Sequence, residues 1–563
     1  MSKKLSLTAL LVFLLSVCSC GGASSVPRAV NAGSQAATTG GQQELSVNET
    51  KSPLPRLVVW LTIDQFRGDY LSRYDALFSD EGLRSLVRSG IWFQEAHYEH
   101  AITETAPGHA TLFTGASPSQ HGIVANSWLR ADGVEIASVW DESSPLTGPG
   151  AEKDASPSQG RSPRQLMVPT VGDELIQNSG GQAKVVGISS KDRGAILPAG
   201  KAGRAYWLGP QGFVSSRYYG ESVPPWLSEH HREHPPESYL KVGWPLAAAE
   251  ELYTARVPPA ESVSTSFGPD FPHSFRSDVA PATVLAQTPF GDASVLDLAR
   301  RAILEEDLGV DSVPDILSLS LSSTDAVGHL FGPESREFQD QLVRLDRSLA
   351  GFFQFLEEHR GADSVLYVLS ADHGGCESAE YLAGLGLPGL RLTEASLLDE
   401  SQRILARRYG RKDLILGSNS PYLFLNHAAL ATGGLSLDEV QGHLAQGLRA
   451  YPGVFDAFAT TGPIGPGELA SRVQISIYPG RSGDVYVVPD LYSLFLQDES
   501  LAATHGSPWN YDTHVPIVIK GSGLTPQVVG RRVDVRSLAP TVSRLMGTPV
   551  PRASTKAPLF EVF

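Results

Sequence analysis

The sequence has little cysteine and no excess of positive charge, and both absences narrow the class of protein. Only three of its 563 residues are cysteines, and two of these, Cys18 and Cys20, fall in the N-terminal segment. Cys376 is then the only thiol of the folded part, which therefore cannot form an intrachain disulfide. Lys and Arg total 45 against 61 Asp and Glu. The chain thus lacks the basic surface of a nucleic-acid-binding protein, and we expect no nucleic acid binding.

The N-terminus contains no apolar run long enough to span a membrane. The stretch from Leu5 to Val17 is shorter than the ~20 residues of a membrane-spanning helix, and it follows the basic pair Lys3 and Lys4. A basic segment followed by a short apolar one predicts an export signal.

The end of this signal is similar to that of bacterial lipoproteins. Val17 and Ser19 stand at the third and first positions before Cys20. We therefore predict a signal peptide over residues 1–20, a lipid anchor on Cys20 and a location in the periplasm at the outer membrane. The alternative is an ordinary signal peptide cut among the small residues 19–25, which gives a soluble periplasmic or secreted protein.

The rest of the chain divides into a linker and a folded domain. Residues 21–56 are small and polar, which is typical of a flexible linker. We expect one domain over 57–563, with loop-rich insertions around 200–285 and 380–480, where proline and glycine are frequent. The sequence does not determine the oligomeric state, and we expect a monomer.

Short apolar runs rich in β-branched residues predict strands buried on both faces. They lie at residues 57–63, 184–188, 315–321, 364–370, 484–488 and 515–519. Between them, residues 335–357 carry apolar side chains every three or four positions, the pattern of an amphipathic helix. Alternating strands and helices predict an α/β fold with a largely parallel central sheet flanked by helices.

Acidic residues and histidines follow three of these strands. Asp64 comes after the first strand, Asp325 and His329 after the third, and Asp372 and His373 after the fourth. Ligands of open α/β sheets collect beyond the carboxyl ends of the strands. Together with His505, which precedes the last strand, these residues can bind two metal ions. Mixed carboxylate and imidazole ligands favour zinc over calcium or magnesium.

At this point the sequence resembles the alkaline phosphatase superfamily, most closely its single-chain bacterial branch with a threonine nucleophile, and more distantly the nucleotide pyrophosphatases/phosphodiesterases. The resemblance covers the chain from about residue 57 to its end. It is carried, in the family's order, by segments at 62–69, 103–115, 120–126, 191–200, 324–329, 371–375 and 504–507.

The resemblance implies an alkaline phosphatase-like core and a set of site residues. Asp325, His329 and His505 would bind one zinc ion. The second zinc ion would be bound by the carboxylates and imidazole of Asp64, Asp372 and His373, with the oxygen of Thr105 completing the site. Thr105 would also be the nucleophile, and the phosphoryl oxygens would contact Asn126, Lys191 and Arg193.

The implied function is metal-dependent hydrolysis of small-molecule phosphate monoesters through a phosphothreonine. Lys191 and Arg193 supply two cations, which favour a monoester dianion over a diester. In an extended segment both side chains would point to the same side. Two alternatives remain: a phosphodiesterase or nucleotide pyrophosphatase on the same scaffold, and a surface lipoprotein that binds metal or phosphate without turnover.

Overall fold

Ten strands form the central sheet of the computed structural model, which describes residues 54–151, 159–255, 268, 270–496 and 500–563. Their order across the sheet is β18 (Gln527–Asp534), β2 (Ile91–His97), β17 (His514–Lys520), β10 (Val365–Ser370), β1 (Leu57–Ile63), β9 (Asp315–Leu321), β6 (Val185–Ser189), β7 (Arg204–Gly209), β8 (Gly212–Ser216) and β5 (Leu146–Thr147).

The sheet is largely parallel, as predicted. Only β17 and β8 run against their neighbours in it. The predicted strands at 57–63 and 315–321 are confirmed residue for residue, and those at 184–188, 364–370 and 515–519 within one residue. All seven residues of β1 are buried, which explains why this strand has a continuous apolar run instead of an alternating one.

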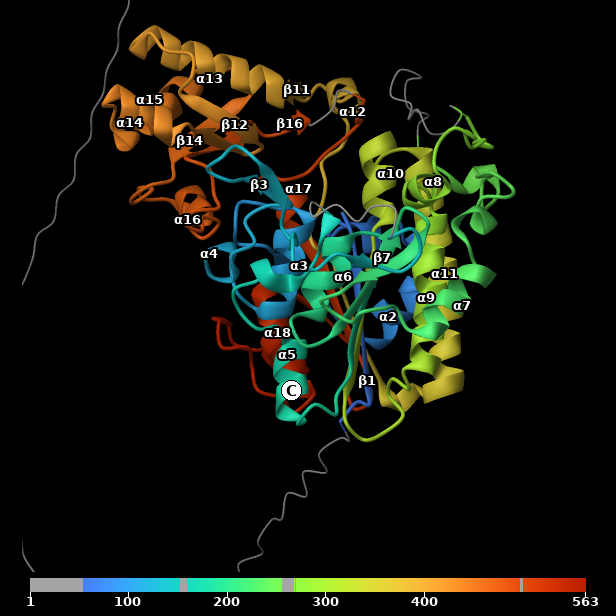
Figure 1. Cartoon of the computed structure of the whole chain (residues 1–563). Helices are drawn as coiled ribbons and strands as arrows, with labels where there is room; N and C mark the ends of the chain where they lie inside the picture. The colour runs from blue at the N-terminus through green and yellow to red at the C-terminus, as the bar shows by residue number, and fades with distance from the viewer. Residues whose placement is uncertain (1–53, 152–158, 256–267, 269, 497–499) are drawn as a thin grey trace, which may run out of the picture. The chain divides into compact units, whose positions relative to one another are not determined.

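Helices cover both faces of the sheet (Figure 1). One face carries α2 (Leu83–Ser89), α9 (Phe290–Glu305) and α11 (Arg336–Arg360), and the other carries α3 (Thr105–Thr114), α5 (Val171–Asn178), α6 (Asp192–Ala199) and α18 (Leu538–Leu545). The predicted helix at 335–357 is α11. It begins where the Ser335 hydroxyl accepts the Phe338 amide hydrogen, and it ends at Gly361, which has a φ of 81°.

The insertion predicted at 380–480 is a folded substructure with its own core, and the expectation of loops there is wrong. Its antiparallel sheet has the order β12 (Ile415–Asn419), β13 (Tyr422–Leu425), β15 (Val485–Pro489), β14 (Val454–Ala459), and α13 (Glu394–Tyr409), α14 (His427–Gly433) and α15 (Leu437–Leu448) pack on it. The run at 484–488 thus belongs to this sheet and not to the central one. Proline and glycine sit in its many turns, which obscured the short elements between them.

The insertion at 200–285 is also partly regular. It contributes β7 and β8 to the central sheet and contains α7 (Pro225–Glu233) and α8 (Pro281–Ala286). The remaining elements are short: α1 (Tyr70–Arg73), α4 (Pro118–His121), α10 (Ser323–Phe331), α12 (Ala379–Gly384), α16 (Glu468–Gln474), α17 (Asn510–Thr513), β3 (Ser127–Leu129), β4 (Glu135–Ala137), β11 (Leu390–Thr393) and β16 (Ser493–Leu496).

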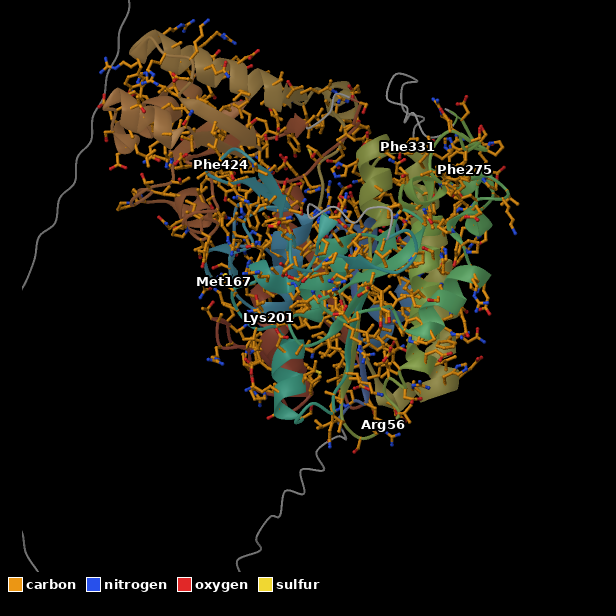
Figure 2. The ribbon with its side chains drawn as sticks, in the orientation of Figure 1. Arg56, Met167, Lys201, Phe275, Phe331 and Phe424 are labelled. Atoms are coloured by element: carbon orange, nitrogen blue, oxygen red, sulfur yellow. The ribbon has the colours of Figure 1, made fainter. Side chains whose placement is uncertain are left out.

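The carboxyl ends of the strands point toward the smaller substructure. Figure 2 places Arg56, just before β1, at one end of the sheet, whereas Phe331 at the end of α10 and Phe424 in β13 lie beyond the other. Within the described ranges, none of the helices is both long and apolar enough to cross a bilayer. The predicted signal peptide, the Cys20 anchor and nearly all of the 21–56 linker lie outside the described residues.

Candidate active site

The six predicted metal ligands meet at the carboxyl edge of the sheet. Asp64 follows β1, and the neighbouring strands β10 and β9 lead to Asp372 with His373 and to α10, which bears Asp325 and His329. The loop before α17 adds His505. Because α10 is helical, Asp325 and His329 lie four residues apart on one helix face, as predicted.

Asp64, Asp372 and His373 form a group whose ligand atoms all lie within 4.8 Å of one another. The Nδ1 atom of His373 donates to the Gly374 carbonyl at 2.8 Å, so a neutral ring keeps a lone pair on Nε2. That Nε2 lies 3.4 Å from Asp64 Oδ1 and 3.7 Å from Asp372 Oδ2. All three atoms are buried without a hydrogen-bond partner among the described residues. Three acceptors facing one another repel, and a divalent cation between them would relieve this.

Asp325, His329 and His505 meet in a similar way. The Nδ1 atoms of the two imidazoles donate to the backbone carbonyls of Ala503 and Thr103, at 2.9 and 2.8 Å. Their Nε2 atoms lie 3.2 and 3.4 Å from Asp325 Oδ1. A carbonyl acceptor behind each ring fixes the tautomer that a metal requires.

The two groups are in direct contact through His373. Its ring stacks on that of His505 with centroids 3.6 Å apart, and its ligand atom also lies within 4.8 Å of those of Asp325 and His505. At this separation, the residue that forms a three-residue group with Asp325 and His505 is His373 and not His329. The structure therefore brings together every predicted ligand, while the division between two ions rests on the resemblance.

Burial and neighbouring charges set the protonation of these groups. Burial and the charge of Asp64 raise the pKa of Asp372 to about 7. Burial also opposes ionisation of Asp325, but His329 and Lys191 outweigh it and hold the pKa of that carboxyl well below its usual range. Burial lowers the pKa of both His373 and His505. Burial acts in the same direction on His329, but the charge of Asp325 outweighs it and raises the pKa of that imidazole. The neutral imidazoles of His373 and His505 beside carboxyls are part of the donor set that zinc prefers.

Thr105 is the first residue of α3 and has 1% of its surface exposed. Its Oγ1 lies 3.4 Å from Nζ of Lys191. The same ammonium donates to Asp64 Oδ2 at 2.7 Å and to Asp325 Oδ2 at 2.6 Å. The predicted nucleophile and a predicted phosphate contact are therefore adjacent, and the lysine also pairs with a carboxylate of each ligand group.

Arg193 lies on the same side as Lys191, but the predicted reason is only partly right. Lys191 has the extended conformation that was expected, whereas Arg193 lies in the first turn of α6. Asp192 between them accepts from Arg161 Nε at 2.6 Å. Burial opposes ionisation of Asp192, but Arg161 and Arg193 hold the pKa of its carboxyl below the usual value. Arg193 Nε is buried without a hydrogen-bond partner among the described residues.

Three further residues shape the site and were missed or given no firm role from the sequence. Glu104 accepts the Asn126 amide at 2.7 Å, and burial raises its pKa to about 7. Gln65, with a φ of 59°, donates through its side chain to Asp325 and through its backbone to Asp372. His109 Nδ1 lies 3.3 Å from Asp372 Oδ2. The sequence shows only that these residues lie near Asp64 and Thr105 in the chain. Nearness in the chain does not reveal in which direction a side chain points.

Asn126 joins the start of α3. Its Oδ1 accepts the backbone amide of Ala106 at 2.9 Å, so its side chain is fixed beside Thr105. It is half-buried and lines an open pocket of about 290 Å³, together with Glu104, Thr105, Lys191, Arg193, Asp325, His329 and His505.

The same pocket also has apolar lining residues. They are Leu330, Pro421, Pro489, Leu494, Phe495 and Leu501. The insertion predicted at 380–480 reaches the pocket through Ser420 and Pro421, while none of the described residues of 200–285 lines it. A pocket lined by cations and by apolar side chains suits a charged group attached to an organic leaving group.

Comparison with known proteins agrees with this geometry. Residues 58–514 match the family model described as type I phosphodiesterase / nucleotide pyrophosphatase, and the chain belongs to that family. Alkaline phosphatase PafA of Elizabethkingia meningoseptica is 32% identical over 91% of this chain and 95% of its own. Alkaline phosphatase PhoV of Synechococcus elongatus is 32% identical over 89% and 91%.

The crystal structure of wild-type PafA superimposes with a TM-score of 0.84 and 31% identity, covering 91% of this chain and 99% of that one. The chain therefore has an alkaline phosphatase-like α/β fold, as the sequence predicted. Membership of this family also makes it an enzyme with a metal-dependent site.

Proposed function

We propose that this protein hydrolyses phosphate monoesters through a phosphothreonine formed on Thr105. The observation that supports this most directly is the position of Thr105 Oγ1, 3.4 Å from the Lys191 ammonium, which also pairs with Asp64 and Asp325 of the two ligand groups. Relatives of nearly full length that are named alkaline phosphatases also support it.

The zinc ions that we propose would be bound by Asp325, His329 and His505, and by Asp64, Asp372 and His373 with Thr105. The chemistry that bound zinc supplies is a lowered pKa for the hydroxyl and positive charge at the leaving oxygen. The orphaned His373 Nε2 and carboxylate oxygens of Asp64 and Asp372 fit such an ion, and so do the imidazoles of His329 and His505, which backbone carbonyls orient.

The chain's own residues hold the reacting groups. The Thr105 oxygen forms a bond to phosphorus as the ester oxygen leaves with a proton. Water then attacks phosphorus, and the Thr105 oxygen leaves to regenerate the hydroxyl and release inorganic phosphate. Lys191, Arg193 and Asn126 line the pocket around Thr105, where two cations and an amide stabilise the phosphoryl oxygens.

A phosphodiesterase activity is the second candidate, favoured by the match to the phosphodiesterase family model. The two cations beside Thr105 argue for the monoester, because only a monoester presents a dianion to them. A binding lipoprotein without turnover would not need a buried threonine hydroxyl beside the lysine that pairs with both ligand groups.

Turnover of p-nitrophenyl phosphate and bis-p-nitrophenyl phosphate by the zinc-loaded protein separates these functions. We expect faster hydrolysis of the monoester, with loss of this activity in Thr105→Ala and Lys191→Ala. A preference for the diester that survives Lys191→Ala would move the protein to the phosphodiesterase class. Binding of zinc and phosphate without hydrolysis of either ester would support the binding lipoprotein.

We also propose export and lipidation at Cys20, on the basis of residues 1–20 alone. Cells fed an alkyne-tagged fatty acid should label the full chain, and Cys20→Ser should abolish the label. An unlabelled wild-type protein in the soluble periplasmic fraction would instead support cleavage among residues 19–25.

A further inference from the structure

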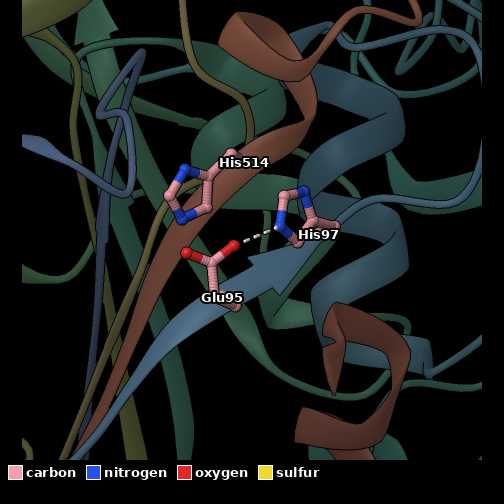
Figure 3. A group of neighbouring side chains, drawn as sticks. All are labelled: Glu95, His97 and His514. Carbon is pink, nitrogen blue, oxygen red and sulfur yellow. Dashed lines mark hydrogen bonds and ion pairs between the residues drawn. The ribbon is translucent and has the colours of Figure 1, made fainter. Parts of the chain in front are cut away.

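Carboxylates and imidazoles also meet away from the pocket around Thr105, where they join strands. Glu95 and His97 of β2 lie beside His514 of β17 (Figure 3). His97 Nε2 is 3.2 Å from Glu95 Oε2, and His514 Nε2 is 2.6 Å from the Gln94 carbonyl oxygen. Both Nε2 atoms therefore have partners on β2, and this cluster fastens β17 to β2.

Glu104 differs from that cluster because it belongs to the pocket itself. Only 8% of its surface is exposed, and it lines the pocket together with Thr105 and Asn126. Among the described residues, its side chain makes one hydrogen bond, in which Oε2 accepts the Asn126 amide hydrogen at 2.7 Å, and no ion pair. A buried carboxylate without an ion pair is costly, so we expect Glu104 to act in the site and not only in the fold.

Asn126 is held by its backbone and by one end of its side chain. Its backbone amide donates to Glu104, its carbonyl accepts the Ser138 amide hydrogen at 2.8 Å, and its Oδ1 accepts the Ala106 amide hydrogen at 2.9 Å. Because the Ala106 amide can only donate, this last bond identifies the side-chain oxygen. The Nδ2 amide has no hydrogen-bond partner among the described residues, so it is the group available to a phosphoryl oxygen in the pocket.

The two residues that hold Asn126 from α3 stand on either side of the predicted nucleophile. Glu104 precedes Thr105, and Ala106 follows it. Glu104 is the N-cap residue of α3 but makes no capping hydrogen bond with its own side chain. The Asn126 oxygen satisfies an amide of the first turn instead. This reciprocal pair of contacts fixes Asn126 relative to Thr105.

We propose that Glu104 is a positioning residue that fixes the Asn126 amide relative to Thr105 Oγ1 and acts on turnover through Asn126. The inference rests on the proposed hydrolysis through Thr105. A donor stabilises the developing charge on phosphoryl oxygens only if it already points at them. Loss of the Glu104 acceptor would release the Asn126 backbone, and a misplacement of about 1 Å can lower a rate about 100-fold.

Glu104 should not influence the binding of metal ions. Its one side-chain hydrogen bond among the described residues goes to Asn126 and to none of the predicted ligands. Gln65, in contrast, donates directly to Asp325 and Asp372. We therefore expect the zinc affinity of Glu104→Ala to equal that of wild type.

A double-mutant cycle on kcat/KM for p-nitrophenyl phosphate tests this role. Glu104→Ala should lower kcat/KM about tenfold, and Asn126→Ala should lower it about 100-fold. The double variant should be no slower than Asn126→Ala, because no amide is left for Glu104 to position. Independent effects would multiply to about 1000-fold, and this result would overturn the proposal.

Conservative and control variants separate positioning from a general structural role. Glu104→Gln keeps a side-chain oxygen that can accept the Asn126 amide hydrogen, so it should restore most of the activity. A Glu104→Gln variant as slow as Glu104→Ala would contradict the proposal. If Glu104→Ala does not fold, Glu104→Leu fills the space without an acceptor and enters the same cycle. The matched control is Glu174→Ala, which removes a similarly buried glutamate of α5, 9% exposed and outside the pocket, and should keep the wild-type kcat/KM.

Failure of this inference is distinguishable from failure of the proposed function. A zinc-loaded wild type that does not hydrolyse p-nitrophenyl phosphate would overturn both. An active wild type, with full activity also in Glu104→Ala at unchanged melting temperature, would overturn only the role of Glu104. A lower zinc affinity in Glu104→Ala would likewise show that Glu104 acts through the metal ligands and not through Asn126.

Discussion

Lys191 and Asp64, which are 127 positions apart in the sequence, form an ion pair of 2.7 Å beside Thr105. The Lys191 ammonium also pairs with Asp325 at 2.6 Å. Burial opposes the charge of Lys191, but Asp325 and Asp64 outweigh this and raise its pKa. One lysine thus neutralises carboxylates from both groups of predicted ligands.

This arrangement makes Lys191 a competitor of the metal ions. In Lys191→Met we expect zinc to bind about tenfold more tightly, equivalent to ~1.4 kcal/mol, because no ammonium has to be displaced from the two carboxylates. Hydrolysis of p-nitrophenyl phosphate should fall at the same time, because a phosphate contact is lost. Zinc affinity is measured by competition with a chelator of known affinity.

The control for this experiment is Lys201→Met, which removes an exposed lysine and should change neither quantity. Weaker zinc binding in Lys191→Met would show that the lysine supports the ions instead of competing with them.

Replacement of Thr105 tests the nucleophile. Thr105→Ala should lower kcat by at least about 10³-fold, or ~4 kcal/mol, while Thr105→Ser retains a hydroxyl and should keep much of the activity. Acid quench during turnover followed by mass spectrometry should find phosphate on residue 105 in wild type. A fully active Thr105→Ala with an unchanged melting temperature would exclude the phosphothreonine.

Arg193 should discriminate between esters. In Arg193→Ala, kcat/KM for the monoester should fall about 100-fold more than that for bis-p-nitrophenyl phosphate, because a diester presents only one negative charge. Arg193→Lys keeps the charge but not the planar guanidinium, and it should be intermediate. Equal losses for both esters would mean that Arg193 supports the fold and not substrate recognition.

Gly108 allows α3 to approach the end of β10. A Cβ at this position would lie 2.1 Å from the Asp372 carbonyl oxygen, so Gly108→Ala should push Asp372 out of place. We expect a loss of about 3 kcal/mol in unfolding free energy and weaker zinc binding.

The matched change is Gly442→Ala in α15, where a Cβ would meet nothing within 4 Å. It should stabilise the protein by ~0.5–1 kcal/mol, because alanine favours helix interiors. Chemical denaturation compares the two. Equal, small effects would show that the Asp372 backbone moves aside without cost.

Asp292 should make stability depend on pH. Burial raises its pKa to about 6, and its carboxylate accepts from the Ser323 amide and from Gln341. Between about pH 4 and 6 the folded state holds a proton that the unfolded state has lost, so stability falls as pH rises. Relative to Asp292→Asn, wild type should lose about 3 kcal/mol across this range. Parallel denaturation curves at pH 4 and pH 7 would contradict this.

Much of the fold was predictable because its signals are local. β1 and β9 are runs of apolar residues with clear ends, and α11 carries a regular apolar stripe over its length. The substructure between α13 and β15 was missed because its strands are short and separated by turns rich in proline and glycine. For the same reason, residues 484–488 were predicted to be a strand of the central sheet, whereas they belong to the smaller antiparallel sheet.

The candidate site likewise has features that the sequence predicted and features that it did not. Spacing predicted that Asp325 and His329 share a helix face, and strand ends predicted where Asp64, Asp372 and His373 meet. Neither could show that Gln65 bridges Asp325 and Asp372, or that Glu104 holds Asn126, because these contacts depend on side-chain directions.

The sequence by itself determined the parallel core, the residues at its carboxyl edge and the family to which the chain belongs, since periodicity and motif spacing are properties of the chain alone. The tertiary structure decided which ligands face one another, how Lys191 divides its charge between Asp64 and Asp325, and that Glu95, His97 and His514 meet across two strands. These relationships join residues distant in sequence, and only the packing of β1, β2, β9, β10 and β17 into one sheet brings their side chains within bonding distance.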